Sequence, residues 1–326
     1  MSADRPNRMA GLAKYRKVVG AVFGFGLFAA ALVVLFRDTD GLSQAAEKVS
    51  GAPLWLLAAA VLLPMLNWLS VTGAFVVLIP RYVPPDGKQV DIGEMAALVG
   101  SAWLLNYLPL RPGLVARVAY HKTVNKVLAR DSARMLVESG ALTGVAVTTL
   151  LAIAVLMMNA PGTTALIVSS VAPLGVTGLA WAVLGLSGSP LWRYAAALEF
   201  KLLDMAIWVA RYAVVFSLVG APLDASRTVL VAAISQFVLL VPLTGNGLGI
   251  REWGVALAAE AGLQADVLNR AAETLAVLPV GIISTWWVAR KLAKHRGQAD
   301  TEEARSPDPG NARGGTVVSE PEGNAP

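Results

Sequence analysis

Six long apolar runs constrain this chain more than any other feature. They lie near residues 18–36, 53–79, 133–158, 163–186, 202–220 and 268–290. An α-helix needs roughly 20 predominantly apolar residues to cross the hydrocarbon core of a bilayer, so each run is long enough to span a membrane. Of all residues, 56% are hydrophobic and only 15% are charged. Soluble domains carry about 25% charged residues. The sequence therefore predicts an all-α polytopic membrane protein with about six full transmembrane helices.

Two further apolar runs are shorter, and each stops at a proline, Pro109 or Pro242. An aspartate precedes each run, Asp91 or Asp224, and its side chain can cap the N-terminus of a helix. After each proline come a glycine-containing bend, an arginine and a less apolar helical segment, in "RPGLVAR" and "TGNGLGIR". Short segments interrupted by Pro and Gly at corresponding positions of two halves are typical of discontinuous helices around a binding site.

The two broken segments align as parts of an internal repeat. The aligned pairs are Pro109 with Pro242, Gly113 with Gly247, Arg117 with Arg251, Met65 with Met205, Trp68 with Trp208 and, approximately, Glu138 with Glu273. We predict a first membrane repeat over residues 18–158 and a second over 163–292. If each broken segment is a re-entrant helical hairpin, each half has three full crossings. Because three is odd, the second half enters from the opposite side, and the repeats are inverted, which suits alternating access.

Basic residues predict the orientation of the chain. Lys and Arg are abundant in the N-terminal segment 1–17, between the second and third crossings, and after the last crossing. Such segments stay on the cytoplasmic side, so we expect a multi-pass protein of the plasma (cell) membrane with both termini in the cytoplasm. The first hairpin then enters from the cytoplasm and the second from outside. Residues 297–326 are polar, acidic and rich in Pro and Gly, which predicts a disordered tail.

Candidate substrate-binding groups are concentrated at the two bends. The ends of half-helices present free N–H groups and a positive partial charge to an anion. Gly247 and Gly249 allow the backbone to approach such a ligand. Arg117 and Arg251 stand just past the bends, and a guanidinium matches two phosphate oxygens at once. Two simpler interpretations stay open: loop arginines such as Arg111 mark the cytoplasmic face, and Glu252 only pairs with a neighbouring cation.

Four more ionisable residues fall inside apolar runs: Glu138, Asp204, Arg211 and Glu273. A charged side chain at the centre of a membrane helix costs at least about 2.5 kcal/mol, so each is a candidate site residue. Asp204 and Arg211 are seven positions apart and share one helix face. They either line one cavity or belong to ion pairs between helices.

The sequence offers little for metal or covalent chemistry. Cysteine is absent and there are two histidines, His121 and His295, which leaves little for a His/Cys metal site. We find no zinc motif and no nucleophilic-serine motif, so neither a cofactor nor a catalytic residue is predicted. We interpret the net charge of +5 as a sign of membrane orientation, and no nucleic-acid partner is expected.

Three stretches resemble the flippase-like family of the lysylphosphatidylglycerol synthase transmembrane region. They are "LLNYLPLRPGLVARVAYHK", "SARMLVESGAL" and "VPLTGNGLGIREWG", and the resemblance covers most of residues 15–292. The first family pattern is matched at Asn106, Pro109, Arg111, Gly113 and Arg117, and the second at Pro242, Gly247, Leu248, Gly249, Arg251 and Glu252. This chain has Leu114 where the family usually has an acidic residue, and Asn246 in place of the first of two paired glycines. The aminoacyltransferase domain of larger members has no counterpart in these residues, so lipid aminoacylation is not implied.

The resemblance implies an integral membrane lipid translocator, which moves a lipid with an anionic or polar head group between leaflets. The expected ligand is a membrane lipid with a phosphate-containing head group. A second hypothesis is a membrane enzyme, or an accessory partner of one, that acts on polyprenyl-phosphate-linked sugars. Glu252 or Glu138 would then supply a carboxylate near the phosphate, and a glycosyltransferase or another lipid-modifying enzyme would be the partner. A small-solute transporter is a third hypothesis.

Overall fold

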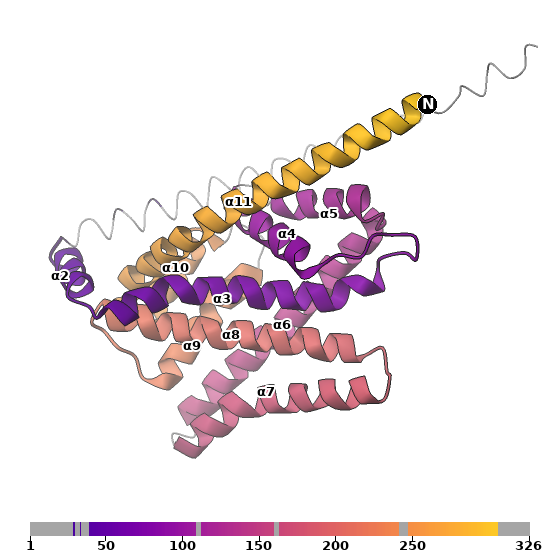
Figure 1. Cartoon of the computed structure of the whole chain (residues 1–326). Coiled ribbons are helices and arrows are strands. Elements are labelled where there is room, and N and C mark those ends of the chain that lie inside the picture. Colours follow the sequence, from indigo (N-terminus) through magenta and orange to yellow (C-terminus); the bar gives the residue numbers. More distant parts are fainter. Residues whose placement is uncertain are drawn as a thin grey trace, which may run out of the picture.

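The computed structural model describes residues 29, 33, 39–108, 112–159, 163–240 and 247–305, and these form helices and connecting turns without a strand (Figure 1). The helices are α2 (Thr39–Ser50), α3 (Leu54–Leu78), the short 3₁₀ turn η1 (Ile79–Arg81), α4 (Ile92–Leu105), α5 (Pro112–Val124), α6 (Ala129–Asn159), α7 (Thr163–Leu186), α8 (Trp192–Leu218), α9 (Ala225–Leu240), α10 (Ile250–Ala258) and α11 (Gly262–Arg305). The predicted all-α class is confirmed.

Three of the described helices are long and apolar enough to cross a membrane. They are Leu54–Arg81, Ala129–Asn159 and Gly262–His295. α8 has 27 residues, which is also long enough, but it carries five charged side chains: Arg193, Glu199, Lys201, Asp204 and Arg211. The predicted first crossing lies outside the described residues except for Ala29 and Val33. The structure therefore shows a helical membrane protein, while the count of six crossings stays a prediction.

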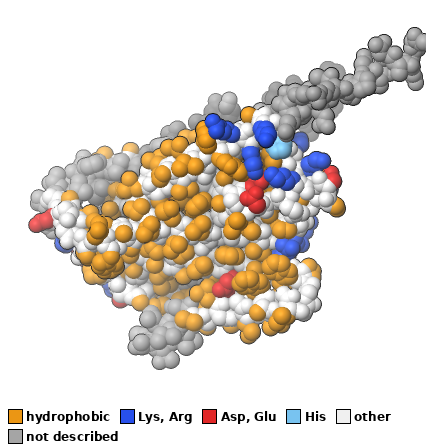
Figure 2. All heavy atoms as spheres, in the orientation of Figure 1, with side chains coloured by type: hydrophobic (Ala, Val, Ile, Leu, Met, Phe, Trp, Pro, Cys, Tyr) orange, Lys and Arg blue, Asp and Glu red, His pale blue; other side chains and the backbone are white. Residues whose placement is uncertain are grey.

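The surface is consistent with this assignment. Hydrophobic side chains cover the middle of the visible face, and Lys and Arg side chains gather at one end, near α5 and the later turns of α11 (Figure 2). A hydrophobic surface is what contact with lipid tails requires, and Lys and Arg side chains are typically abundant at the cytoplasmic boundary of a membrane protein.

α3 and α8 lie side by side at the centre of the bundle (Figure 1). Around them, α4 packs against α11 and α9 packs against α6. Glycines bring α4 and α11 close together: a Cβ atom added at Gly281 would lie 2.4 Å from Leu104 Cβ, and one at Gly100 would lie 2.6 Å from Ser284 Oγ. Small residues are the usual means by which membrane helices approach each other this closely.

The two helices that precede the predicted interruptions, α4 and α9, are capped by the predicted aspartates. Asp91 caps α4, since its carboxylate accepts the Glu94 N–H at 2.7 Å. Asp224 does the same for α9 by accepting the Arg227 N–H at 2.9 Å. α4 ends at Leu105 and α9 at Leu240, and each is followed by a shorter helix that packs on it, α5 or α10. The prolines of both bends lie outside the described residues, as does Arg111.

α11 extends into the segment 297–326, for which the sequence predicts a disordered tail. α11 continues to Arg305, so residues 297–305 are helical. This part of the chain, "GQADTEEAR", is rich in Ala, Glu and other helix-forming residues, and it extends a helix that is already formed. Residues 1–17 and 306–326 lie outside the described part of the chain.

Candidate functional site

A cavity of about 270 Å³ lies inside the bundle, with walls from α3, α4, α5, α8, α9 and α11. Both halves of the chain therefore contribute to it. Its apolar wall includes three indole rings, those of Trp68, Trp103 and Trp208, together with Phe75. Five of the predicted site residues line it: Asn106, Arg117, Asp204, Arg211 and Glu273. The remaining polar lining side chains are Asn67 and Gln236.

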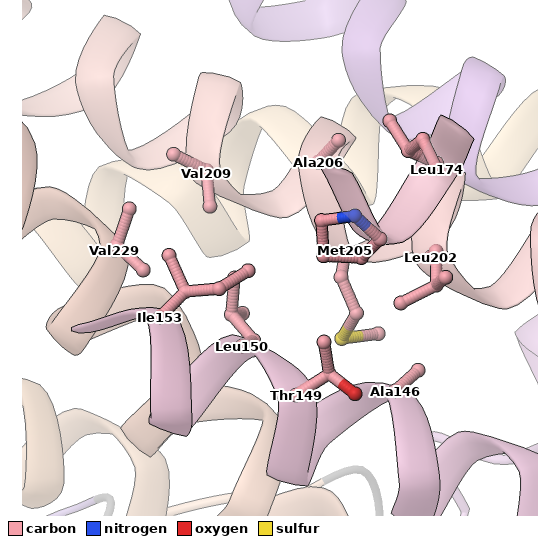
Figure 3. A pocket seen from close by; sticks show the side chains of 11 residues that line it. Ala146, Thr149, Leu150, Ile153, Leu174, Leu202, Met205, Ala206, Val209 and Val229 are labelled. Carbon is pink, nitrogen blue, oxygen red and sulfur yellow. The ribbon is translucent and has the colours of Figure 1, made fainter. Parts of the chain in front are cut away.

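A second pocket, of about 140 Å³, lies among α6, α7, α8 and α9 (Figure 3). Its walls are almost wholly apolar, and the labelled side chains of Leu150, Ile153 and Met205 project into it. The hydroxyl group of Thr149 donates to the Val145 carbonyl oxygen at 2.9 Å. This pocket therefore offers no free polar group that would hold a charged ligand.

Arg211 joins three helices through a buried hydrogen-bond network. Its Nη1 donates to Asn67 Oδ1 on α3 at 3.0 Å, and its Nε and Nη2 donate to Asn269 Oδ1 on α11 at 3.1 and 2.9 Å. Nη2 also donates to Glu273 Oε2 at 2.8 Å. The guanidinium carbon lies 3.7 Å from the centroid of the Trp208 ring. Arg211 thus pairs between helices and lines the cavity, so both predicted interpretations apply to it.

Asp204 lies on the same face of α8 as Arg211, as predicted, and it shares Asn67 with Arg211 as a hydrogen-bond partner. Its Oδ1 accepts a hydrogen bond from Asn67 Nδ2 at 2.7 Å. Lys201 is buried one turn before Asp204, and its Nζ lies 5.7 Å from the centroid of the Phe75 ring. Along α8 the buried charges are therefore positive at Lys201, negative at Asp204 and positive at Arg211. Asn67 bridges Asp204 and Arg211.

Glu273 connects the end of α4 to the second half of the chain. Its Oε1 accepts hydrogen bonds from Tyr107 Oη at 3.0 Å and from Trp103 Nε1 at 3.3 Å. Its Oε2 lies 2.8 Å from Arg211 Nη2 and 3.6 Å from Arg251 Nη1. One buried carboxylate therefore contacts side chains from both interrupted segments, since Tyr107 follows α4 and Arg251 belongs to α10.

Glu252 pairs with a cation, as the simpler interpretation expected, but that cation is not the adjacent Arg251. Adjacent residues on a helix point about 100° apart because a turn contains 3.6 residues, so these two side chains face different neighbours. Arg251 Nε donates to Asp266 Oδ2 at 3.1 Å, and both side chains are fully buried. Glu252 Oε1 accepts from Arg270 Nε at 2.5 Å, and its Oε2 accepts the Gly249 N–H at 2.7 Å. Neither Arg251 nor Glu252 lines the cavity.

Gly247 and Gly249 shape the entry into α10. Their φ angles are +68° and +82°, in the left-handed region that favours glycine. Gly249 is the N-cap of α10, and its N–H is the group that Glu252 accepts. These glycines therefore set the backbone that holds Glu252 and Arg251, and the cavity wall does not include them.

Arg117 differs from the other buried cations. Its side chain is 5% exposed and lines the cavity from α5, with its guanidinium carbon 4.3 Å from the centroid of the Phe75 ring. No carboxylate pairs with it among the described residues, and its Nε has no hydrogen-bond partner there. Asn106 Oδ1, which also belongs to the cavity wall, is likewise without a partner in the described part of the chain.

Glu138 lies apart from the cavity. Its carboxylate accepts from Arg134 Nε at 3.1 Å, lies 3.7 Å from Arg81 Nη1, and accepts a hydrogen bond from the Tyr82 hydroxyl group. These partners come from the start of α6 and the turn after α3. Arg111, the remaining predicted site residue, lies outside the described residues.

Sequence reasoning missed several members of the network. Asn67 is a single amide inside a long apolar run, while Asp266, Asn269 and Arg270 precede Glu273 on one helix. Asp266, Arg270 and Glu273 are spaced by four and three positions, which places them on one face of α11. This spacing could have indicated that the three charged side chains belong to one buried network. Among the described residues, no group of three or more acidic and histidine side chains is arranged to hold a metal ion.

The chain matches no protein-family model, no curated protein and no solved structure. Its function is therefore argued from the cavity and from the charges around it.

Proposed function

We propose that this chain is an integral membrane lipid translocator whose cavity receives the anionic or polar head group of a lipid. Arg117 carries the proposal, because its buried guanidinium lines the cavity and no carboxylate of the described residues pairs with it. A buried charge is costly until it is paired, so an anion that enters the cavity gains a ready partner. The planar guanidinium suits a phosphate group, whose oxygens accept two N–H groups at once.

The packing of the helices supports the inverted repeats that we propose. α4 belongs to the first repeat and packs on α11 of the second, while α9 of the second repeat packs on α6 of the first. The corresponding helices α3 and α8 pack on each other. A pseudo-two-fold axis in the membrane plane would produce this reciprocal packing, in which a helix of each repeat contacts the other repeat. Transporters with such an axis bind substrate where the repeats meet.

The corresponding arginines of the two repeats stand in different surroundings. Arg251 is enclosed and pairs with Asp266. Glu273 follows Glu138 by 135 positions, and the same offset relates Asp266 to Asp131. Asp131 is 31% exposed and lies 3.7 Å from Arg130, so it is not the counterpart for Arg117 that Asp266 is for Arg251. We propose that transport exchanges these arrangements, so that Arg117 binds the head group in one conformation and Arg251 binds it in the other. A ligand shifts the populations of two such conformations when its affinities for them differ.

The enzyme hypothesis receives less support from the site. It requires a carboxylate beside the phosphate, and the two carboxylates predicted for that role, Glu252 and Glu138, do not line the cavity. Both are engaged by neighbouring cations instead.

Lipid binding to the purified protein tests the proposal. The indole rings of Trp68, Trp103 and Trp208 line the cavity, so head-group binding should change the intrinsic fluorescence. The probe is short-chain phosphatidylglycerol added to protein in phosphatidylcholine nanodiscs, with short-chain phosphatidylcholine as the uncharged comparison. Arg117→Met should weaken phosphatidylglycerol binding by about 1.5–3 kcal/mol, the range for a hydrogen bond to a charged group. Arg117→Lys should restore part of the affinity, because a lysine lacks the planar fork.

Arg130→Met is the matched control, since the Arg130 side chain is 82% exposed and removal of its charge leaves the cavity intact. Equal affinity of the wild type and Arg117→Met for phosphatidylglycerol would exclude Arg117 as the head-group ligand and remove the main support for the proposal.

A further inference from the structure

His121 is a fully buried histidine on the same face of α5 as Arg117. Residues four positions apart on a helix lie one above the other, so Arg117, His121 and Asn125 follow one another at successive turns. Arg117 lines the cavity at one end of this row. At the other end, Asn125 contacts Glu94 and Lys88 near the exposed basic side chains.

The contacts of Asn125 fix the hydrogen positions on the His121 ring. Asn125 Nδ2 donates to Glu94 Oε1 at 2.9 Å and to the Lys88 carbonyl oxygen at 3.3 Å. Both of those atoms are acceptors, so the amide cannot be reversed, and Asn125 Oδ1 faces His121 Nδ1 at 3.1 Å. We therefore assign the hydrogen to Nδ1, which leaves a bare lone pair on Nε2 of the neutral ring. His121 Nε2 is buried and has no hydrogen-bond partner among the described residues.

Burial, more than the surrounding charges, keeps the His121 ring neutral. Arg117 contributes a positive charge from the preceding turn. Glu94 approaches from α4, but it is already paired with Lys291 of α11 at 3.0 Å and lies 3.7 Å from Lys88. α6 brings Asp131, which pairs with Arg130 instead. α5 is not among the helices long enough to cross a membrane, and burial there lowers the pKa of His121 to about 4.

We infer that His121 Nε2 is a proton-binding site coupled to occupation of Arg117 by an anionic head group. The inference rests on the proposed function, because it needs an anion at Arg117. Like charges at this helical spacing destabilise each other, and an anion that neutralises Arg117 removes this repulsion. His121 then takes a proton from water at Nε2, while its Nδ1–H continues to donate to Asn125. Because coupling between two sites is reciprocal, protonation of His121 strengthens anion binding by the same factor.

The pH dependence of phosphatidylglycerol affinity tests this coupling. The affinity should depend on pH between about 4, the pKa of His121 without the anion, and the higher pKa that His121 acquires when the anion neutralises Arg117. A phosphodiester keeps its single charge in this range, so the probe itself contributes no pH dependence. For the wild type we expect affinity to rise as pH falls, by at most about tenfold per pH unit for one proton. His121→Gln should bind with an affinity that does not depend on pH. The chain has one other histidine, His295, at the far end of α11, and His295→Gln should follow the wild type.

Calorimetry of the wild-type protein measures proton uptake on lipid binding directly, without any substitution. Phosphatidylglycerol binding in two buffers with different ionisation enthalpies should show proton uptake just above about pH 4, the pKa of His121 before the anion binds. Binding without pH dependence and without proton uptake would overturn the inference and leave the proposed function intact. A pH dependence that persists in His121→Gln would also overturn it. Failure of the wild type to bind phosphatidylglycerol at any of these pH values would instead contradict the proposed function.

Discussion

Replacement of Arg117 by Met should stabilise the fold while it removes the proposed anion site. The substitution keeps most of the apolar stem and deletes a buried charge that has no carboxylate partner among the described residues. A membrane helix bears a cost of about 2.5–3.5 kcal/mol for an arginine at its centre. The stacking of the guanidinium on Phe75, at 4.3 Å, offsets part of that cost by about 0.5–2 kcal/mol. We therefore expect the free energy of unfolding to rise by about 0.5–3 kcal/mol.

Arg211→Met is the contrasting variant. It removes a guanidinium of similar burial, but one that donates to Asn67, Asn269 and Glu273. Glu273 would keep Tyr107, Trp103 and Arg251 as partners, but it and two amide oxygens would lose the Arg211 donor. Removal of one partner of a buried ion pair costs about 3–5 kcal/mol. The double variant Arg211→Met with Glu273→Gln should recover part of this loss, because the buried carboxylate whose nearest cation was removed is then neutral.

The assay is equilibrium unfolding of the purified protein in mixed micelles, followed by tryptophan fluorescence. The wild type, Arg117→Met and Arg211→Met would be compared under identical conditions, without anionic lipid. If Arg117→Met destabilises the protein as much as Arg211→Met does, Arg117 has a strong internal partner and our account of its free guanidinium is refuted.

Three further predictions concern the backbone and the orientation. Gly249→Ala should lower the free energy of unfolding by about 1–2 kcal/mol, since φ is +82° there, whereas Gly140→Ala, which meets no atom within 4 Å, should not. Thermal unfolding checks both. Gly113→Ala should destabilise the protein by about 1–3 kcal/mol and weaken anion binding, because the added Cβ would lie 2.6 Å from Ala102 Cα and displace α5 with Arg117. Chemical unfolding and lipid titration of this variant would reveal either effect. The chain has no cysteine, so Ser50→Cys should react with a membrane-impermeant maleimide only from outside, and Gln89→Cys only from the cytoplasm. The reverse pattern would contradict the predicted orientation.

The positions of the helix breaks were predictable because their causes are local. A capping aspartate and a proline lie within one run of sequence, and the structure confirms that Asp91 and Asp224 cap the helices that stop before the two prolines. The positive φ angles of Gly247 and Gly249 agree with the prediction that the bend requires glycine. The helix caps and the glycine bend depend only on residues within a few positions along the chain.

The partners of the buried charges were not predictable in the same way. Arg251 pairs with Asp266, fifteen positions later, and Arg211 pairs with Glu273, sixty-two positions later, because α8, α10 and α11 meet in space. Sequence proximity instead indicated Glu252, which faces another neighbour. Asp131 and Glu138 do not pair with Arg117 because α6 places them beside Arg130 and Arg134, a tertiary property that no local pattern contains.

Transport in liposomes tests the central claim most directly. The purified protein would be reconstituted into phosphatidylcholine vesicles that contain fluorescent phosphatidylglycerol, and the rate at which the inner-leaflet label becomes accessible to an impermeant quencher would be measured. We predict that the wild type moves the lipid faster than protein-free vesicles, and that Arg117→Met, although at least as stable as the wild type, falls to the protein-free rate. Transport by Arg117→Met at the wild-type rate would contradict the claim that the head group passes through the cavity beside Arg117.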